Sequence, residues 1–234
     1  MLVSRQKHLK RNKFKLNIKR KKLEQTSKYK YLGVFFDEAL NWNAHIEHVC
    51  KKLSRVSGVL SKLRHSLDLD LLKTIYYALV YPHILYGVMS WGGASENILK
   101  KMRSAQNRVV NIMRFIPFGS YEMNPVYNEM EILQIDELHK LEIGKFMYKF
   151  SNDLLPENFK EYFKHVSTIH NYNTRMAKNY CMYPIRAKSK LIKKTLKYKG
   201  VEVWNSIPIA IKQLPSVKSF SKQLKSSFIN PVQQ

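Results

Sequence analysis

Alternation of basic and apolar residues near the N-terminus predicts two strands. In residues 13–19, KFKLNIK, the apolar Phe14, Leu16 and Ile18 alternate with basic or polar residues, which is the period-two pattern of a half-buried strand. The stretch KYKYLGVFF, residues 28–36, predicts a second strand, with the charged KRKKLEQTS between them. We therefore expect a hairpin or small sheet with a basic outer face.

From residue 43 the apolar spacing changes to three and four, which is typical of amphipathic helices. The first helix is expected to begin near Asn43, a good N-cap residue, and its apolar face is Ile46, Val49, Cys50, Leu53, Val56, Leu60 and Leu63. Asp68 or Asp70 is expected to cap a second helix, which Pro82 breaks or kinks. A third helix is expected to follow Ser95.

The stretch FIPFGSYEMNP, residues 115–125, is the best candidate for a domain boundary. Beyond it the pattern predicts helices that begin at Asn124-Pro125, at about Asp136 and at Pro156, an extended basic connection over residues 165–190, and a short amphipathic helix in residues 216–228. With only 8 glycines and 8 prolines in 234 residues, a turn-rich sandwich of strands is disfavoured. The expected fold class is mainly α with a small N-terminal β element.

Positive charge changes this picture most. The chain has 41 Lys and Arg against 17 Asp and Glu, a formal net charge of +24. Residues 1–30 contain one carboxylate, Glu24, and after Lys164 the only carboxylate is Glu202. Such an excess makes a compact chain repel itself, so we expect a polyanionic partner, namely RNA, DNA or an RNA–DNA hybrid. The alternative is a basic soluble protein without such a partner.

The compartment is expected to be intracellular, in the cytoplasm or nucleus. Two distant cysteines, Cys50 and Cys181, make no disulfide framework, and the N-terminus lacks the apolar stretch of a secretory signal. The uncharged residues 75–94 are long enough to span a bilayer. Pro82, His83, Ser90 and three glycines interrupt them, so a buried hairpin in a helical domain is favoured and no membrane partner is expected.

No catalytic, metal or cofactor site follows from the residues. Close carboxylate pairs such as Asp68/Asp70 and Asp136/Glu137 stand where helix caps are expected, and the histidines and cysteines lack four ligands at a zinc spacing. Ser90 has no glycine two residues before it, as a nucleophile elbow requires. What remains is a basic surface with interleaved tyrosines, a combination typical of nucleic-acid binding. The tyrosines singled out for their closeness to basic residues in the sequence are Tyr29, Tyr31, Tyr172, Tyr180 and Tyr183.

Six short motifs together carry a resemblance to a known family. In chain order they are YKYLGVFFDEALNWNAHI, IYYALVYPHILYGVMSWG, LKKMRSAQNRVVNIM, LPENFKEYF, HNYNTR and GVEVWNSIP. In this order they resemble the C-terminal part of reverse transcriptases from non-LTR retrotransposons of the jockey-like and related LINE groups. The resemblance implies three parts: a palm remnant in residues 1–40, a helical thumb in residues 41–115, and a helical basic C-terminal region in residues 116–234.

The resemblance also implies roles for residues. Tyr31, Leu32, Gly33 and Val34 match a strand that serves as a primer grip, where a glycine lets a nucleic-acid strand approach the backbone closely. The family's catalytic carboxylates precede this strand, and residues 1–28 cannot supply them. We therefore expect a reverse transcriptase fragment that binds RNA or primer–template through a basic thumb and is inactive alone, with divalent metal, as Mg²⁺, needed only in the intact polymerase.

The candidate nucleic-acid-binding residues are Lys19, Arg20, Lys21, Lys22, Lys30, Lys51, Lys52, Arg55, Lys100, Lys101, Arg103, Arg108, Arg175, Lys178, Arg186 and Lys188. Arg175 either braces a loop or contacts phosphate. Trp91 and Trp204 are expected to anchor small cores, and Tyr86 to act in a turn and in packing. The alternative function is a domesticated helical module that binds nucleic acid or another protein.

Overall fold

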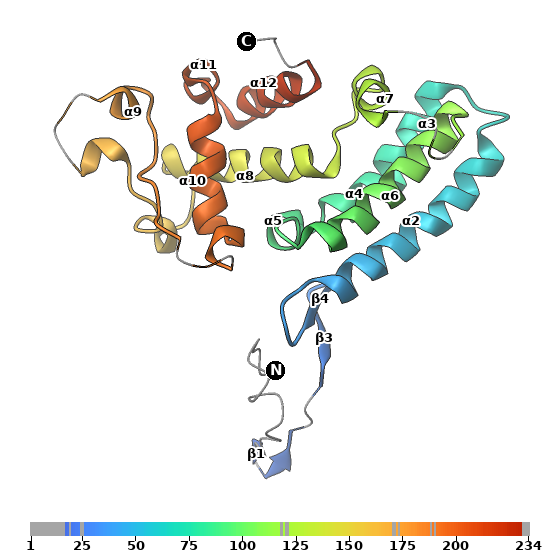
Figure 1. Ribbon diagram of the computed structural model, residues 1–234, viewed down its shortest axis with the longest axis horizontal. Helices are drawn as coiled ribbons and strands as arrows, with labels where there is room; N and C mark the ends of the chain where they lie inside the picture. The colour runs from blue at the N-terminus through green and yellow to red at the C-terminus, as the bar shows by residue number, and fades with distance from the viewer. Residues whose placement is uncertain are drawn as a thin grey trace. The chain divides into compact units, whose positions relative to one another are not determined.

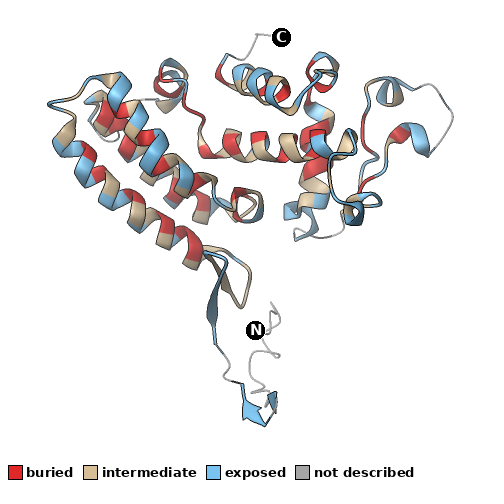
Figure 2. Cartoon of the chain, turned by 180° about the vertical axis from the view of Figure 1, so that it is seen from behind, coloured by how far each residue is buried: buried red, intermediate tan, exposed pale blue. Residues whose placement is uncertain are grey.

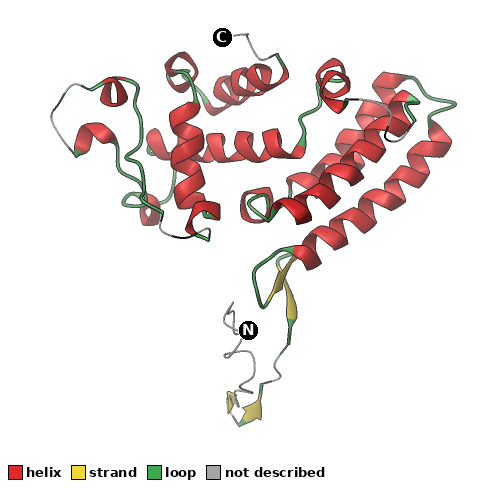
Figure 3. Ribbon diagram, viewed as in Figure 1, coloured by secondary structure: helices red, strands yellow, loops and turns green. Residues whose placement is uncertain are grey.

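Helices dominate the computed structural model, and its strands lie between residues 17 and 37 of the described chain (Figure 3). The structure describes residues 17–18, 20–23, 26–117, 119, 122–169, 172, 174–187, 189 and 191–230. It forms two compact units: unit 1 is Met1–Gly87 with Ala94–Arg114, and unit 2 is Val88–Gly93 with Phe115–Gln234. A mainly α fold with a small β element near the N-terminus is thereby confirmed.

The strand pairing differs from the expected one. β1 (Asn17–Ile18) pairs with β2 (Lys21–Lys22), and β3 (Lys28–Tyr31) pairs with β4 (Val34–Asp37), both antiparallel. The stretch 28–36 is thus a hairpin in itself, and the described part of 13–19, Asn17–Ile18, pairs with Lys21–Lys22. The reason is the turn at Leu32 and Gly33, whose positive φ angles of 45° and 82° suit a two-residue type I′ turn. Residues 13–16 and 19 lie outside the described residues.

Unit 1 is built on two long parallel helices, α2 (Asn43–Leu63) and α6 (Glu96–Arg114), which lie side by side in Figure 1. Near their starts Cys50 Sγ lies 3.8 Å from Met102 Sδ, and near their ends the Arg64 guanidinium donates to the Ile112 carbonyl. Between them the chain returns through α3 (Leu69–Ile75), the π-helix η1 (Tyr76–Val80) and α4 (Tyr81–Leu85). The buried Tyr76 hydroxyl accepts from Gln106 on α6.

The helix starts of unit 1 confirm one predicted cap and correct another. Asp68 caps α3, because its carboxylate accepts from the Leu71 N–H at 2.8 Å. Asn43 does not cap α2, whose N-cap is Trp42 in the left-handed conformation. The Asp37 carboxylate shapes this entry: its oxygens accept from the backbone N–H groups of Ala39, Asn41 and Trp42 at 2.9–3.0 Å.

Pro82 disturbs its helix as expected, through a wider turn. Proline has no N–H to donate, and the Tyr81 N–H just before it bonds to the Tyr76 carbonyl five residues back, which makes the π-helix. The uncharged residues 75–94 are divided among α3, η1, α4 and α5 (Val88–Trp91). Within the described chain, none of the helices combines the length and the hydropathy needed to cross a bilayer.

Unit 2 is organised around α8 (Ile135–Ser151), which contacts α5, α10 (Leu196–Ser206) and α12 (Val217–Ile229) (Figure 1). Its other helices are α7 (Met123–Glu129), η2 (Glu157–Phe159), η3 (Val166–Thr168), α9 (Arg175–Lys178), η4 (Ile192–Lys194) and α11 (Ile209–Lys212). Trp91, Trp204 and Phe220 are fully buried, so both predicted tryptophan anchors are confirmed. The buried faces of α8, α10 and α12 are marked in Figure 2.

The sequence predicted the long elements of unit 2 better than the short ones. The helices expected at about 136–150 and 216–228 are present as α8 and α12, and Gln134 with Glu137 closes a capping box on α8. The helix expected at Pro156 is only the three-residue η2. The described residues between 165 and 190 are mostly irregular as expected, with η3 and α9 as short exceptions, whereas α10 and α11 were not predicted.

Candidate nucleic-acid interface

The β3–β4 hairpin presents one open strand to solvent. Every residue of β3 is exposed, whereas β4 is half-buried (Figure 2). Tyr29, Tyr31 and Leu32 have exposed fractions of 55%, 58% and 72%. Large aromatic and apolar side chains at such exposure suit contact with a partner, because burying them against it removes apolar surface from water. The primer-grip residues suggested by the resemblance therefore lie at the exposed tip of a hairpin.

Tyr86, at the C-terminal end of α4, holds this tip in place. Its hydroxyl donates to the Leu32 carbonyl, and its ring lies so close to Gly33 that a Cβ there would be 3.2 Å from Cε1. The expected packing role of Tyr86 is confirmed. The turn is thus preset by a side chain from more than fifty residues further along the chain, a contact that sequence patterns do not reveal.

Phe35 fixes the hairpin to α2. Its N–H donates to Nδ1 of the buried His45 at 3.4 Å, and its ring centre lies 4.9 Å from that of His48. Lys30 pairs with Phe35 across the two strands and places its ammonium 5.7 Å from the centre of the phenyl ring. Because strand side chains alternate between faces, Tyr29 and Tyr31 lie on the opposite face from Lys30.

Three permanently charged side chains act electrostatically on His48, and we call Lys30, Lys52 and Arg55 the cation cluster. Burial lowers the pKa of His48 below its ordinary value, and the positive charges of Lys52, Lys30, His83 and Arg55 lower it further. Lys30 on β3 and Lys52 and Arg55 on α2 therefore act on the same imidazole. Within the described part of the chain, no member of the cation cluster forms an ion pair with a carboxylate.

The pKa values of two further histidines, His45 and His83, are lowered by burial and by the charge of Lys52. Burial, then His48 and Lys52, lower the pKa of His45 to about 4. Burial followed by the charge of Lys52 also lowers the pKa of His83. At neutral pH these imidazoles are therefore neutral, and the charge offered by the site belongs to lysine and arginine. A bound phosphate would relieve the repulsion among these cations.

The predicted cations on α6 behave differently from those on α2. Lys101 bonds to Glu47 at 3.3 Å and to Asn43 at 3.1 Å, and Arg103 pairs with Glu96. These exposed pairs contribute little to stability and leave little free charge for a ligand. Lys100, Arg108 and, on α2, Lys51 are exposed. Of the predicted thumb residues, the structure groups Lys52 and Arg55 with Lys30.

The remaining predicted residues are exposed and belong to other elements. They are Arg20, Lys21 and Lys22 in the β1–β2 hairpin and Arg175, Lys178 and Arg186 in unit 2. Arg175 is exposed at the start of α9, and both of its predicted roles stay predictions. Lys19 and Lys188 lie outside the described residues.

Several carboxylates of the described chain accept from backbone N–H groups or form surface ion pairs. Asp37 and Asp68 accept from backbone N–H groups, and Glu137 does the same at Gln134. No group of three or more potential metal ligands occurs among the residues that the structure describes. His45, His48 and Cys50 share one helix, with His45 directed to Phe35 and Cys50 to α6.

Comparison with curated proteins finds relatives among polymerases of mobile elements. The RNA-directed DNA polymerase from mobile element jockey of Drosophila funebris is 30% identical over 100 residues, which cover 41% of this chain and 11% of the relative. The probable RNA-directed DNA polymerases from transposon BS and transposon X-element of Drosophila melanogaster are 25% identical over 100 residues and 30% identical over 93 residues. The chain spans about a tenth of the length of these relatives.

No family model matches the chain, and no solved structure matches it significantly. The partial matches show that the sequence is related to RNA-directed DNA polymerases of mobile elements.

Proposed function

We propose that this chain is a fragment of a non-LTR retrotransposon reverse transcriptase and that it binds RNA or an RNA–DNA primer–template through unit 1. The polymerase relatives support the first part. The observation that carries the second part is the cation cluster, in which Lys30 of the exposed strand β3 and Lys52 and Arg55 of α2 act on the same histidine and lack carboxylate partners in the described chain. In this proposal unit 1 acts as the thumb and Tyr31–Val34 act as the primer grip.

In this proposal the cations bind phosphate groups, and the shape of the turn lets the primer backbone come close. Lys30, Lys52 and Arg55 would neutralise phosphates, which gives affinity without reading sequence. The turn at Gly33 would approach the primer backbone, because no Cβ stands in the way. Since Tyr86 already holds this turn, little conformational entropy is lost when the strand binds. We therefore expect binding with little base preference.

Polymerisation is not part of the function proposed for this chain. By the resemblance, the catalytic carboxylates and their Mg²⁺ precede the primer-grip strand, and Glu24 is the one carboxylate in residues 1–28. We expect no primer extension when the purified chain is given primer–template, deoxynucleotides and Mg²⁺, as measured on a sequencing gel. Products longer than the primer, absent from a mock purification, would refute this assignment.

The binding proposal is tested by charge removal at fixed salt. The double variant Lys52→Gln/Arg55→Gln is compared with Lys218→Gln/Lys222→Gln, which removes two exposed charges from α12. Fluorescence anisotropy with an RNA–DNA hybrid is expected to show about tenfold weaker binding for the α2 variant, at about 0.7 kcal/mol for each lost phosphate contact. The α12 variant is expected to stay within about twofold of the unmodified chain. Equal losses would indicate diffuse attraction and contradict the proposed site.

A further inference from the structure

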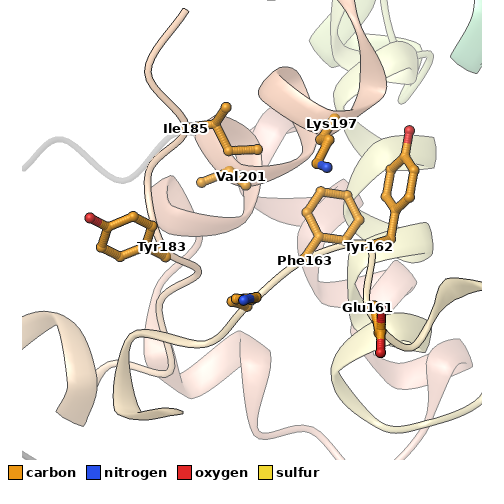
Figure 4. A pocket seen from close by; sticks show the side chains of 8 residues that line it. Glu161, Tyr162, Phe163, Tyr183, Ile185, Lys197 and Val201 are labelled. Carbon is orange, nitrogen blue, oxygen red and sulfur yellow. The ribbon is translucent and has the colours of Figure 1, made fainter. Parts of the chain in front are cut away.

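Unit 2 contains a small cavity of about 160 Å³ with aromatic walls (Figure 4). In this view Tyr183 lies on one side of the opening and Tyr162 and Phe163 lie on the other, with Ile185 and Val201 completing the apolar lining. Phe163 and Val201 are buried, whereas Tyr183 is 49% exposed. The cavity therefore has a firm apolar floor and one accessible aromatic ring.

The two sides of this cavity are tied together by backbone bonds. The Tyr183 N–H donates to the Lys164 carbonyl at 2.8 Å, and Asn205 on α10 bonds to both backbone groups of Met182 at 2.8 and 2.9 Å. Phe163 is held by edge contacts with Tyr162 and Phe150, each with ring centres 5.0 Å apart. The backbone segments that carry Tyr183 and Phe163 are thus joined before any ligand binds.

Two lysines and one glutamate line the opening of the cavity. Lys164 and Lys197 line the cavity, and Lys197 Nζ lies 5.3 Å from the centre of the Tyr162 ring. Neither lysine forms an ion pair within the described part of the chain, and Glu161 also lines the opening. A bare phosphate would meet apolar walls and a carboxylate there. A flat, neutral ring with phosphates attached on either side suits the cavity better.

We propose that this cavity binds one unpaired base of a single-stranded RNA or DNA segment, stacked against Tyr183, with the flanking phosphates at Lys164 and Lys197. The volume is below the roughly 300 Å³ at which sites for drug-sized ligands begin, so it admits a ring and not a whole nucleotide. Stacking on aromatic side chains is how sequence-tolerant single-strand binders hold bases. This inference rests on the proposed function: unit 2 would bind a single-stranded segment of the nucleic acid that unit 1 binds.

The test uses the full chain and two octanucleotides of equal charge. One contains a single 2-aminopurine among abasic residues, and the other is abasic throughout. The unmodified chain is expected to bind the first roughly 5- to 100-fold more tightly and to quench its 2-aminopurine fluorescence. Tyr183→Ala is expected to abolish both the preference and the quenching. Tyr183→Phe, which keeps the ring, and Leu154→Ala, which removes an exposed side chain outside the cavity, are expected to preserve them.

Equal affinity of the unmodified chain for the two octanucleotides would refute the proposed base site. The same would follow if Tyr183→Ala still preferred the octanucleotide that contains 2-aminopurine as strongly as the unmodified chain does. If hybrid binding then still depended on Lys52 and Arg55, the proposed function would stand without the pocket. If the Tyr183-dependent preference were present but the chain had no affinity for the hybrid, the pocket would stand and the proposed function would fall. The two failures are therefore distinguishable.

Discussion

Gly33 is the residue at which the hairpin tolerates substitution least. Its φ of 82° disfavours any residue with a Cβ, and a Cβ there would lie 3.2 Å from the Tyr86 ring, so close that the ring must shift. Gly33→Ala is therefore expected to destabilise the hairpin by about 1–2 kcal/mol and to release the turn from Tyr86. Hydrogen exchange measured by mass spectrometry should show faster exchange in peptides covering residues 28–37.

Gly119→Ala is the matched control for this variant. Gly119 has a similar φ of 85° but nothing within 4 Å of a built Cβ. It shares the backbone penalty without the clash, so exchange in residues 28–37 should be unchanged. If Gly33→Ala also left this exchange unchanged, Tyr86 would not be holding the hairpin.

His45 makes the stability of unit 1 dependent on pH. Its pKa is about 4 in the folded chain and 6.5 as the ordinary value, so the unfolded chain binds the proton more readily. The contribution of neutral His45 to the free energy of unfolding is fully present above pH 6.5 and is lost as the pH falls through 4. At pH 5 the loss from this residue is expected to be of the order of 1–2 kcal/mol. Urea unfolding at pH 7.5 and pH 5 measures it.

His45→Asn separates this titration from general acid sensitivity. Asparagine keeps an acceptor near the position of Nδ1 for the Phe35 N–H but does not titrate. The variant should lose less stability between pH 7.5 and pH 5 than the unmodified chain. The same loss in both proteins would show that other groups, such as His48 or His139, govern the pH response.

At the scale of elements, α10 holds the irregular segment before it through Asn205. Met182 is fully buried, and Asn205 bonds both its N–H and its carbonyl. Asn205→Ala leaves these two groups buried without partners, which is expected to cost about 2 kcal/mol or more. Limited proteolysis should then cut residues 165–190 faster. Glu202→Ala on the exposed side of α10 should not change the cutting rate, and equal rates in both variants would contradict this anchoring role.

The sequence predicts a helix correctly where apolar residues recur at spacings of three and four over several turns. The α2, α6, α8 and α12 helices follow from apolar spacing, and Asp68 was a readable cap. The pairing of β3 with β4 was missed because Leu32, not a usual residue at positive φ, shares the turn with Gly33. The cap of α2 was missed because Asp37 shapes the entry from six residues before the helix. These outcomes rest on local conformations that an apolar pattern does not encode.

At the scale of the whole molecule, composition predicted a polyanionic partner but not where it binds. The sequence nominated sixteen cations, and the structure places Lys30, Lys52 and Arg55 around His48 while Lys101 and Arg103 are engaged with carboxylates. Lys30 joins α2 only through the docking of Phe35 on His45 and His48. Such a grouping depends on tertiary contacts, so charge counts alone could not give it.

The most direct test of the account is the salt dependence of binding to an RNA–DNA hybrid. Each phosphate contact contributes about 0.9 to the slope of log affinity against log salt for a duplex. Lys52→Gln/Arg55→Gln is expected to reduce the magnitude of this slope by about 1.8, whereas Lys218→Gln/Lys222→Gln is expected to leave it unchanged. An unchanged slope in the α2 variant would show that the cation cluster does not contact phosphate and would contradict the proposed function.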